Sequence, residues 1–240
     1  MIRRLHLQLP TESATADGQP VRLLAVSDER VASLDDVRNR AALEPLDAVL
    51  GAGDLEPDYL AFLADAFRVP LLYVRGNHDR DAGWTIGSEH IPEALENRVE
   101  RVGGLVIAGL SWPGKDRGRA ERDGTAAWFQ ALGTVARARL GGAAPDIVIS
   151  HVPPRGLGDA PEDEYHRGFS AYHWLCRQLN PPLWLHGHTT AASTVDWRTR
   201  WGGTTLVNVT GGVLLEIEPV ASVAPKSRPT ADATVKIGRR

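Results

Sequence analysis

Five short polar motifs, each directly behind an apolar run, constrain the fold of this chain of 240 residues more than any other feature. Apolar runs of this length, bounded by turn-forming residues, are typical of buried strands. In an open α/β sheet, the residues that follow the strands meet at one edge, where ligand sites form. The runs are Val21–Val26, Ala48–Leu50, Pro70–Val74, Ile147–Ile149 and Leu183–Leu185. The motifs behind them contain Asp28, Gly53-Asp54, Gly76-Asn77-His78-Asp79, His151 and His186-Gly187-His188.

The side chains in these motifs share one kind of chemistry. Carboxylate oxygens, amide oxygens and imidazole nitrogens are ligands for hard or borderline divalent metals. Such groups at five separate strand ends are improbable by chance. The pattern therefore predicts a metal site at the carboxyl edge of the sheet.

Each motif also has a structural alternative. Asp54 could cap the helix that follows it, as Asp at a strand end often does. Residues 76–79 could form only a turn, because Asn and Asp favour turns. Alone, His151 would be an ordinary core or surface histidine. His186 would face the same way as His188 on an extended strand, and could be a further ligand or could orient one.

In order and spacing, the motifs resemble those of the calcineurin-like metallophosphoesterases, in which D-x-H, G-D, G-N-H-D/E, a lone H and G-H-x-H follow one another. The resemblance covers about residues 20–218. It implies an α/β fold (α+β by some schemes), a four-layer αββα sandwich of two mixed β-sheets flanked by helices. It also implies hydrolysis of phosphate esters at a dinuclear metal centre. The first motif reads Ser-Asp-Glu at residues 27–29, and with the segment 166–169 it is similar to a bacterial subgroup of this family.

Carried over residue by residue, the resemblance assigns the metal ligands. Asp54 would bridge two metals, and Asn77, His151 and His188 would complete the shell of the second metal. Asp28 would belong to the first metal. The expected cofactor is a divalent ion of Mn, Fe, Zn, Ni or Co, with one ion tightly bound and a second possible.

The resemblance assigns the catalytic chemistry to His78, which would donate a proton or contact the phosphate and would be oriented by Asp79. Two positions depart from the family pattern, because Arg30 and Thr190 stand where first-metal histidines are expected. We expect Arg30 to replace the first metal in part, pairing with either metal-site aspartate at rest and with the substrate phosphate during turnover. The alternative is an Arg30 that points to solvent beside a weak first site.

The segment 153–169 leaves a strand end that carries a histidine ligand, so it should overhang the site. Arg155 and Arg167 could hold a second phosphate or the ester group, and His166 could supplement the depleted first site. Together with Asn77, these residues form the predicted substrate-binding set. A solvated surface loop is the alternative for Arg155 and for His166.

No Gly/Ser-rich or Pro-rich linker interrupts the strand and helix signals, so we predict a single domain over residues 1–219. The tail 220–240 is poor in apolar residues and is expected to be disordered. Capping and periodicity predict helices at 33–43, 57–67, 123–140 and 168–180, and a hairpin of 97–102 with 104–110. We predict that the runs 193–197, 203–209 and 212–218 form the last, antiparallel strands of the second sheet. The segment 115–122 is expected to be a solvated loop.

The net charge and the hydropathy of the chain limit the kinds of partner that we expect it to bind. The formal net charge is −3 and no long run of Lys or Arg is present, so long nucleic acids are unlikely partners. The N-terminus lacks a signal-peptide pattern, and no apolar stretch approaches the ~20 residues that span a bilayer. We therefore expect no membrane association and a cytoplasmic location.

The predicted function is the hydrolysis of a small phosphodiester or phosphomonoester by a metal-activated water. The site would have a complete second-metal shell and a depleted first-metal shell. Two other classes stay open: a catalytically degenerate protein that binds a metal and a phosphorylated ligand, and a nuclease. The sequence leaves the physiological substrate, the native metal and the oligomeric state undetermined.

Overall fold

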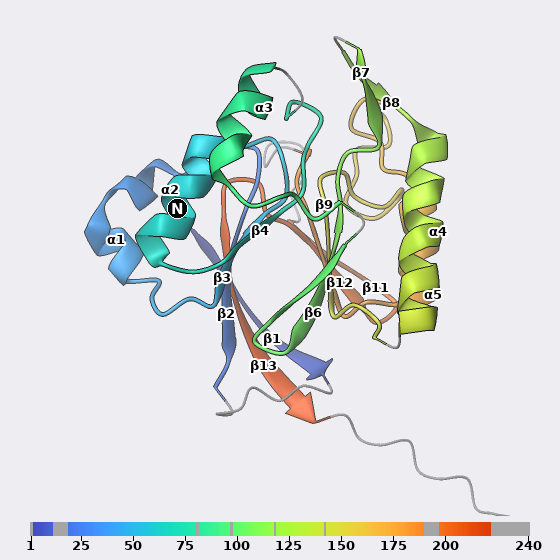
Figure 1. Ribbon diagram of the computed structural model, residues 1–240. Coiled ribbons are helices and arrows are strands. Elements are labelled where there is room, and N and C mark those ends of the chain that lie inside the picture. Colours follow the sequence, from blue (N-terminus) through green and yellow to red (C-terminus); the bar gives the residue numbers. More distant parts are fainter. Residues whose placement is uncertain are drawn as a thin grey trace, which may run out of the picture.

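Two β-sheets packed face to face, with helices on both outer sides, make up the computed structural model of this chain (Figure 1). The structure describes residues 2–11, 19–79, 82–96, 98–117, 119–141, 143–189 and 197–221. The predicted α/β class and four-layer αββα sandwich are confirmed. Across the described ranges, no helix combines the length and the apolar character needed to cross a bilayer.

The first sheet is built around three parallel strands that lead to the first three motifs. Its strand order is β1 (Arg3–Thr11), β13 (Val213–Ala221), β2 (Val21–Val26), β3 (Ala48–Gly51) and β4 (Leu71–Tyr73). β2, β3 and β4 run parallel, whereas β13 runs antiparallel to β2 and parallel to β1. β3 is buried along its whole length, as expected for a central strand with layers on both faces.

The second sheet leads to the last two motifs. Its strand order is β11 (Arg198–Trp201), β12 (Thr204–Asn208), β10 (Leu183–His186), β9 (Ile147–Ser150), β6 (Leu105–Leu110) and β5 (Val99–Val102). The four central strands run parallel, and the two edge strands are antiparallel to their neighbours. The predicted hairpin is confirmed as β5 and β6.

Helices cover the outer face of each sheet. α1 (Val37–Ala41), α2 (Pro57–Phe67) and α3 (Ala82–Gly87) lie outside the first sheet, and α4 (Gly124–Gly141) and α5 (Ser170–Leu179) lie outside the second (Figure 1). Short 3-10 turns span Ala32–Asp35 and Ser88–His90. α2 begins at Pro57, whose fixed φ suits a first turn, and ends at Arg68 in the left-handed conformation.

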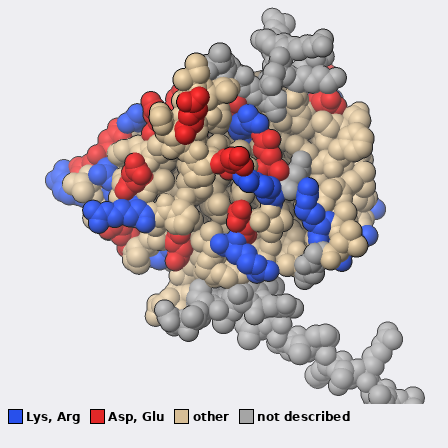
Figure 2. All heavy atoms as spheres, viewed as in Figure 1, with Lys and Arg blue, Asp and Glu red and all other residues tan. Residues whose placement is uncertain are grey.

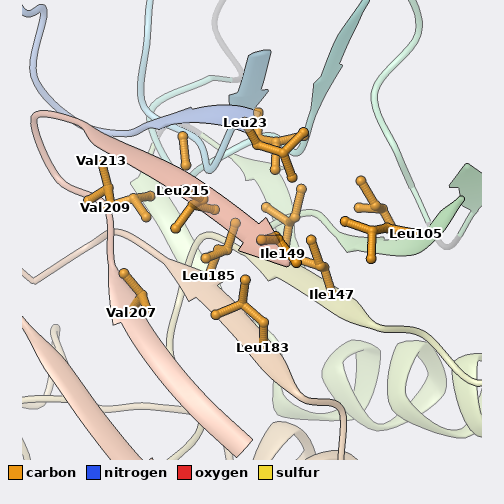
Figure 3. Packing of buried hydrophobic residues seen from close by; sticks show 14 of the residues in the cluster. Leu23, Leu105, Ile147, Ile149, Leu183, Leu185, Val207, Val209, Val213 and Leu215 are labelled. Atoms are coloured by element: carbon orange, nitrogen blue, oxygen red, sulfur yellow. The ribbon is translucent and has the colours of Figure 1, made fainter. Parts of the chain in front are cut away.

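An apolar layer between the two sheets fixes the position of the strand ends. Leu23 and Leu215 of the first sheet meet Ile149 and Leu185 of the second in this layer (Figure 3). Two further apolar clusters are present, one between the first sheet and its helices and one between the second sheet and its helices. Burying one Leu or Ile side chain contributes about 1.5–3 kcal/mol, so this layer holds the two sheets firmly together.

The last strand lies in a different sheet from the one predicted. The prediction that the run 212–218 finishes the second sheet is wrong, because this run forms β13 between β1 and β2. The alternation of a strand shows which face is apolar but does not name its neighbour. The sequence analysis does not predict the partner strand β1, and β13 ends at Ala221 rather than at 218.

Other local differences concern short segments. The segment 115–122, predicted as a loop, forms the antiparallel strands β7 (Gly114–Arg117) and β8 (Arg119–Arg122). Thr190, most of the predicted strand 193–197 and the residues 222–240 lie outside the described residues. The assignment of residues 1–219 to one domain stays a prediction.

Candidate metal centre

Strand ends from both sheets meet at one edge of the molecule. Asp28, Asp54 and Asn77 follow β2, β3 and β4 of the first sheet. His151 and His188 follow β9 and β10 of the second sheet. The candidate site therefore lies across the seam between the sheets, and each sheet contributes part of it.

Four donor groups cluster at this seam around Nε2 of His151. Nε2 of His151 lies 3.1 Å from Oδ2 of Asp54, 2.9 Å from Oδ1 of Asn77 and 3.2 Å from Nδ1 of His188. The two histidines and Asn77 are buried. These are the four residues predicted to surround the second metal, and their oxygen and nitrogen atoms suit a divalent transition metal.

Hydrogen bonds to the backbone orient both imidazole rings. Nδ1–H of His151 donates to the carbonyl of Ala52 at 2.9 Å, and Nε2–H of His188 donates to the carbonyl of Tyr165 at 2.9 Å. Each ring is left with its other nitrogen directed into this cluster. Such bonds fix the tautomer and the direction of a ligating histidine.

Asp28 adds a second carboxylate to the cluster. One donor atom each of Asp28, Asp54 and His151 lie within 4.8 Å of one another. The carboxylate of Asp28 also accepts the amide N–H of His188 and the hydroxyl of Thr210, both at 3.1 Å. Asp54 lies close to both Asp28 and His151, and its bridging role stays a prediction.

Three candidate ligands have an unusual backbone conformation. Asp28, Asp54 and His188 have φ angles of 61°, 56° and 66°, in the left-handed region that side chains disfavour. Among the described residues, Arg68 and Asn180 share this conformation, and both are helix C-caps, where it is common. The conformation costs about 1–2 kcal/mol per residue, so three cases at one edge indicate a functional constraint.

Glycines allow the ligand loops to approach one another. A Cβ atom on Gly76 would lie 2.0 Å from Oδ1 of Asp54, and one on Gly187 would lie 2.3 Å from Oδ2 of Asp28. Gly53 has a φ of +93°, which only glycine adopts easily. The glycines of the motifs are therefore required by the close packing around the candidate metal position.

The electrostatics of the cluster favour a cation. Burial alone would lower the pKa of His151, but the carboxylate of Asp54 raises it to about 9. Burial would raise the pKa of Asp54, yet His151 and the amide of His78 lower it overall. A cluster that attracts a proton this strongly, and in which donor atoms of Asp28, Asp54 and His151 lie within 4.8 Å of one another, fits a divalent metal.

Asp79 has a different role from the one predicted. Its Oδ2 accepts the amide N–H groups of Asp54 and Gly76, both at 2.7 Å. The prediction that Asp79 orients the ring of His78 is therefore wrong. Burial, and then the charge of Asp54, raises the pKa of Asp79 to about 6. Asp79 ties two ligand loops together.

His78 lies at the mouth of the site beside Tyr165, a residue that the motif analysis missed. Nε2 of His78 is 4.0 Å from Oδ2 of Asp54 and 3.4 Å from the hydroxyl of Tyr165. The same hydroxyl accepts a hydrogen bond from Nδ2 of Asn77 at 2.5 Å. The one signal for Tyr165 in the sequence was its position in the loop predicted to overhang the site.

Arg30 lines a cavity of about 420 Å³ that opens beside the metal site. Its guanidinium group donates to Asp35 at 2.8 Å and lies over the ring of Tyr59, 5.2 Å from the centroid. The predicted resting pair with Asp28 or Asp54 is therefore wrong. The guanidinium group of Arg30 instead pairs with Asp35, which lies in the 3-10 turn that follows it in the chain.

The other predicted substrate residues lie away from this cavity. The ring of His166 pairs with Asp163 and packs 5.1 Å from the ring of His188, measured between centroids. It is thus beside a second-metal residue rather than at the depleted first site. Arg155 and Arg167 line a separate cavity on the other side of the overhanging loop.

His186 does not join the four clustered donor groups. Its ring is buried, and a Cβ atom on Gly158 would lie 3.0 Å from its Nε2. Burial lowers its pKa to about 4, so the ring is neutral at pH 7. His186 therefore packs against the overhanging loop.

Fold and site together define an α/β protein with a candidate metal centre between two sheets. The family model of the calcineurin-like phosphoesterases matches residues 29–191, and the chain belongs to this family. A metal-dependent hydrolase is the class of protein that this membership indicates. No curated protein matches the chain.

Several solved structures are similar to this chain. TT1561 of Thermus thermophilus is similar with a TM-score of 0.52 and 17% identity, over 80% of this chain and 89% of that chain. At this identity the likeness concerns the fold alone. GAP50, the anchor in the inner membrane complex of Plasmodium, has a TM-score of 0.48 and 12% identity, over 80% of this chain and 71% of that chain. The sulfate thiohydrolase SoxB of Thermus thermophilus has a TM-score of 0.40 and 20% identity, over 73% of this chain and 36% of that chain.

Proposed function

We propose that this chain hydrolyses a small phosphodiester or phosphomonoester with a divalent metal held at the seam of the two sheets. The observation that carries the proposal is the convergence of Asp54, Asn77 and His188 on Nε2 of His151. Asp28 lies beside this cluster, with a donor atom within 4.8 Å of donor atoms of Asp54 and His151. Membership of the calcineurin-like phosphoesterase family supports the reaction class.

The residues around the metal position prepare it for this chemistry. A divalent cation bound there supplies positive charge to a phosphoryl oxygen and lowers the pKa of water. The carbonyls of Ala52 and Tyr165 keep the two ligand nitrogens directed inwards. Asp79 holds the loops that carry Asp54 and Asn77 at a constant separation.

His78 is the residue best placed to give a proton to the leaving oxygen. Its side chain is exposed at the mouth of the site, and an imidazole can donate a proton to a leaving oxygen. The hydroxyl of Tyr165 lies between His78 and Asn77 and holds the ring near the cavity. Tyr165 is therefore a positioning residue in this proposal.

Arg30 contributes a permanent positive charge to the same cavity. Its ion pair with Asp35 is exposed, and exposed pairs contribute little to stability. A substrate phosphate can therefore replace Asp35 as the partner of the guanidinium group. Bidentate hydrogen bonds make arginine well suited to this contact.

The surface charge supports a small substrate. Basic and acidic side chains are interspersed on the described part of the face shown in Figure 2, and they form no continuous basic stripe there. A long nucleic acid depends on many phosphate contacts along such a stripe. A cavity of about 420 Å³ accommodates a small ester.

Elemental analysis of the purified protein, with hydrolysis of an aryl phosphodiester and an aryl phosphomonoester in the same samples, tests the proposal. We expect at least one tightly bound equivalent of metal and activity that rises on addition of Mn or Zn. His151→Ala should lose both the metal and the activity, because it removes the central donor. His90→Ala, at an exposed histidine far from the cluster, is the matched control and should keep both.

The stoichiometry also decides the form of the site. One equivalent with activity means a mononuclear enzyme, and two equivalents mean that other groups compensate for the missing histidines. Bound metal without turnover on several ester types would contradict the proposal. That outcome would favour a protein that binds a phosphorylated ligand without hydrolysing it.

A further inference from the structure

A second cavity, of about 510 Å³, lies on the outer side of the second sheet, where α4 and α5 begin. Within the described residues, its lining and the lining of the cavity at the metal site share no member. Three arginines from three separate segments border it. They are Arg122 at the end of β8, Arg155 in the loop behind β9, and Arg167 just before α5.

The three guanidinium groups have no carboxylate partners in the part of the chain that the structure describes. Arg122 donates to the backbone carbonyls of Tyr165 and Arg167. Arg167 donates through Nε to the carbonyl of Pro161 at 3.2 Å. These bonds position Arg122 and Arg167 without neutralising their charges.

Positive charge exceeds negative charge around this cavity. Burial, and then the neighbouring charge of Arg167, lowers the pKa of Arg122. Glu164 also lines the cavity, and Asp159 lies close by. The carboxylate oxygens of Asp159 each accept a backbone amide at 2.8 Å, and three guanidinium groups thus stand against two carboxylates. An anion in the cavity would relieve the repulsion between the arginines.

The first turn of α5 faces the same cavity. Its N-cap residue, Phe169, makes no side-chain capping bond, and Ser170 and Ala171 line the cavity. α4 differs, because the carboxylate of Asp123 caps it by accepting the amide of Thr125 at 2.9 Å. The N–H groups at the start of a helix favour phosphate, so α5 adds to the attraction of the arginines.

We propose that this cavity is a second ligand site, separate from the metal centre, that binds a phosphate group. Guanidinium groups form bidentate hydrogen bonds with phosphate oxygens. Trp128 lies along the wall, with its ring centroid 5.5 Å from that of Trp174. A flat ring carried by the phosphate would stack on such a wall. The ligand that fits this cavity is therefore inorganic phosphate or a nucleoside monophosphate.

The ring of Trp112 and the carbonyl of Tyr165 each contact both this site and the metal centre, since the carbonyl accepts from Arg122 and from His188. The guanidinium group of Arg122 lies 5.7 Å from the centroid of Trp112, and the ring of His188 lies 5.7 Å from it, measured between centroids. No metal-site residue lines the second cavity among those described. Phosphate binding in this cavity should therefore persist when the metal is removed.

Calorimetric titration of the full-length protein with inorganic phosphate tests the proposal, as purified and after treatment with a chelator. We expect saturable binding of one equivalent after chelation. The double variant Arg155→Ala/Arg167→Ala should weaken this binding by about tenfold or more, because two charge-assisted contacts are lost. Arg200→Ala, at an exposed arginine on β11 outside the cavity, is the matched control and should bind as the unaltered protein does.

A second titration with AMP distinguishes the two sources of phosphate. Tighter binding of AMP than of phosphate, lost in Trp128→Ala, would identify a nucleotide-type ligand, and equal affinities would identify inorganic phosphate. The proposal is overturned if the chelated protein binds neither probe, or if the double arginine variant binds as tightly as Arg200→Ala does. Neither result bears on hydrolysis at the metal centre, which the elemental and kinetic assays test separately.

Discussion

Asp54 is the residue on which most contacts of the candidate site depend. Its Oδ2 faces His151 at 3.1 Å, and its Oδ1 accepts the amide of His78 at 2.9 Å. Its own amide donates to Asp79 at 2.7 Å. These bonds offset the cost of its left-handed backbone conformation, with a φ of 56°. One residue thus links a ligand, the candidate proton donor and the positioning carboxylate.

His78→Ala should keep the metal and lose activity selectively. The expected loss is about 10²–10⁴-fold for an alkyl phosphodiester, whose leaving oxygen needs a proton, and much smaller for a nitrophenyl ester. Elemental analysis and the kcat on both esters measure the two effects. Equal losses for both esters would instead assign His78 to phosphate binding.

Arg30→Ala should lower kcat/KM for the phosphodiester by about 10–100-fold, because a charge-assisted contact with phosphate is lost. The metal content should not change, since Arg30 contacts Asp35 and Tyr59 rather than a ligand. Asp35→Ala is the control for the loss of the ion pair and should keep the activity. Unchanged kinetics in Arg30→Ala would remove Arg30 from the mechanism.

The strand-to-helix loops are the elements that build the site. The loop behind β3 and the loop behind β4 each contribute an amide that Asp79 accepts. Gly76 lets these loops lie so close that a Cβ atom would be 2.0 Å from Oδ1 of Asp54. The geometry of the ligands is therefore a property of the pair of loops.

Gly76→Ala should displace the carboxylate of Asp54 and weaken metal binding by at least about tenfold, with a loss of unfolding free energy of roughly 1–3 kcal/mol from overpacking. Gly124→Ala is the matched control, because a Cβ atom there meets no atom within 4 Å. Metal titration and denaturant unfolding measure both effects. Normal metal affinity in Gly76→Ala would show that the loop relaxes without moving the ligand.

At the scale of the whole molecule, the candidate metal would join two sheets that otherwise meet through apolar side chains. Asp54 and Asn77 come from the first sheet, and His151 and His188 from the second. The apolar layer between the sheets, shown in Figure 3, sets the distance between these two halves. Metal binding and the packing of the sheets should therefore support each other.

Removal of the metal should lower the midpoint of thermal unfolding. At a free metal concentration about 1,000-fold above Kd, binding stabilises the native state by about 4 kcal/mol, which corresponds to roughly 8–16 °C for a chain of this size. Differential scanning calorimetry with and without a chelator measures the shift. His188→Ala should show a much smaller shift, and an equal shift in this variant would place the metal elsewhere.

Much of the fold and the ligand set could be predicted because the signals are local. Each candidate ligand follows an apolar run within a few residues, and the glycines beside Asp54, Asn77 and His188 are visible in the motifs. The hairpin β5–β6 and the helix α2 likewise follow from turn, capping and periodicity signals. The place of β13 could not be predicted in the same way, since it depends on strands far apart in the chain.

By itself, the sequence determined which donor groups stand at the strand ends, because side-chain chemistry and strand periodicity are local properties. Only the tertiary structure decided what these groups contact. Asn77 donates a hydrogen bond to the hydroxyl of Tyr165, which lies 88 positions further along the chain. Asp79 accepts backbone amides, and Arg30 donates to Asp35. The paths of the loops and the packing of the two sheets select these partners, and neither is encoded in any one segment of the chain.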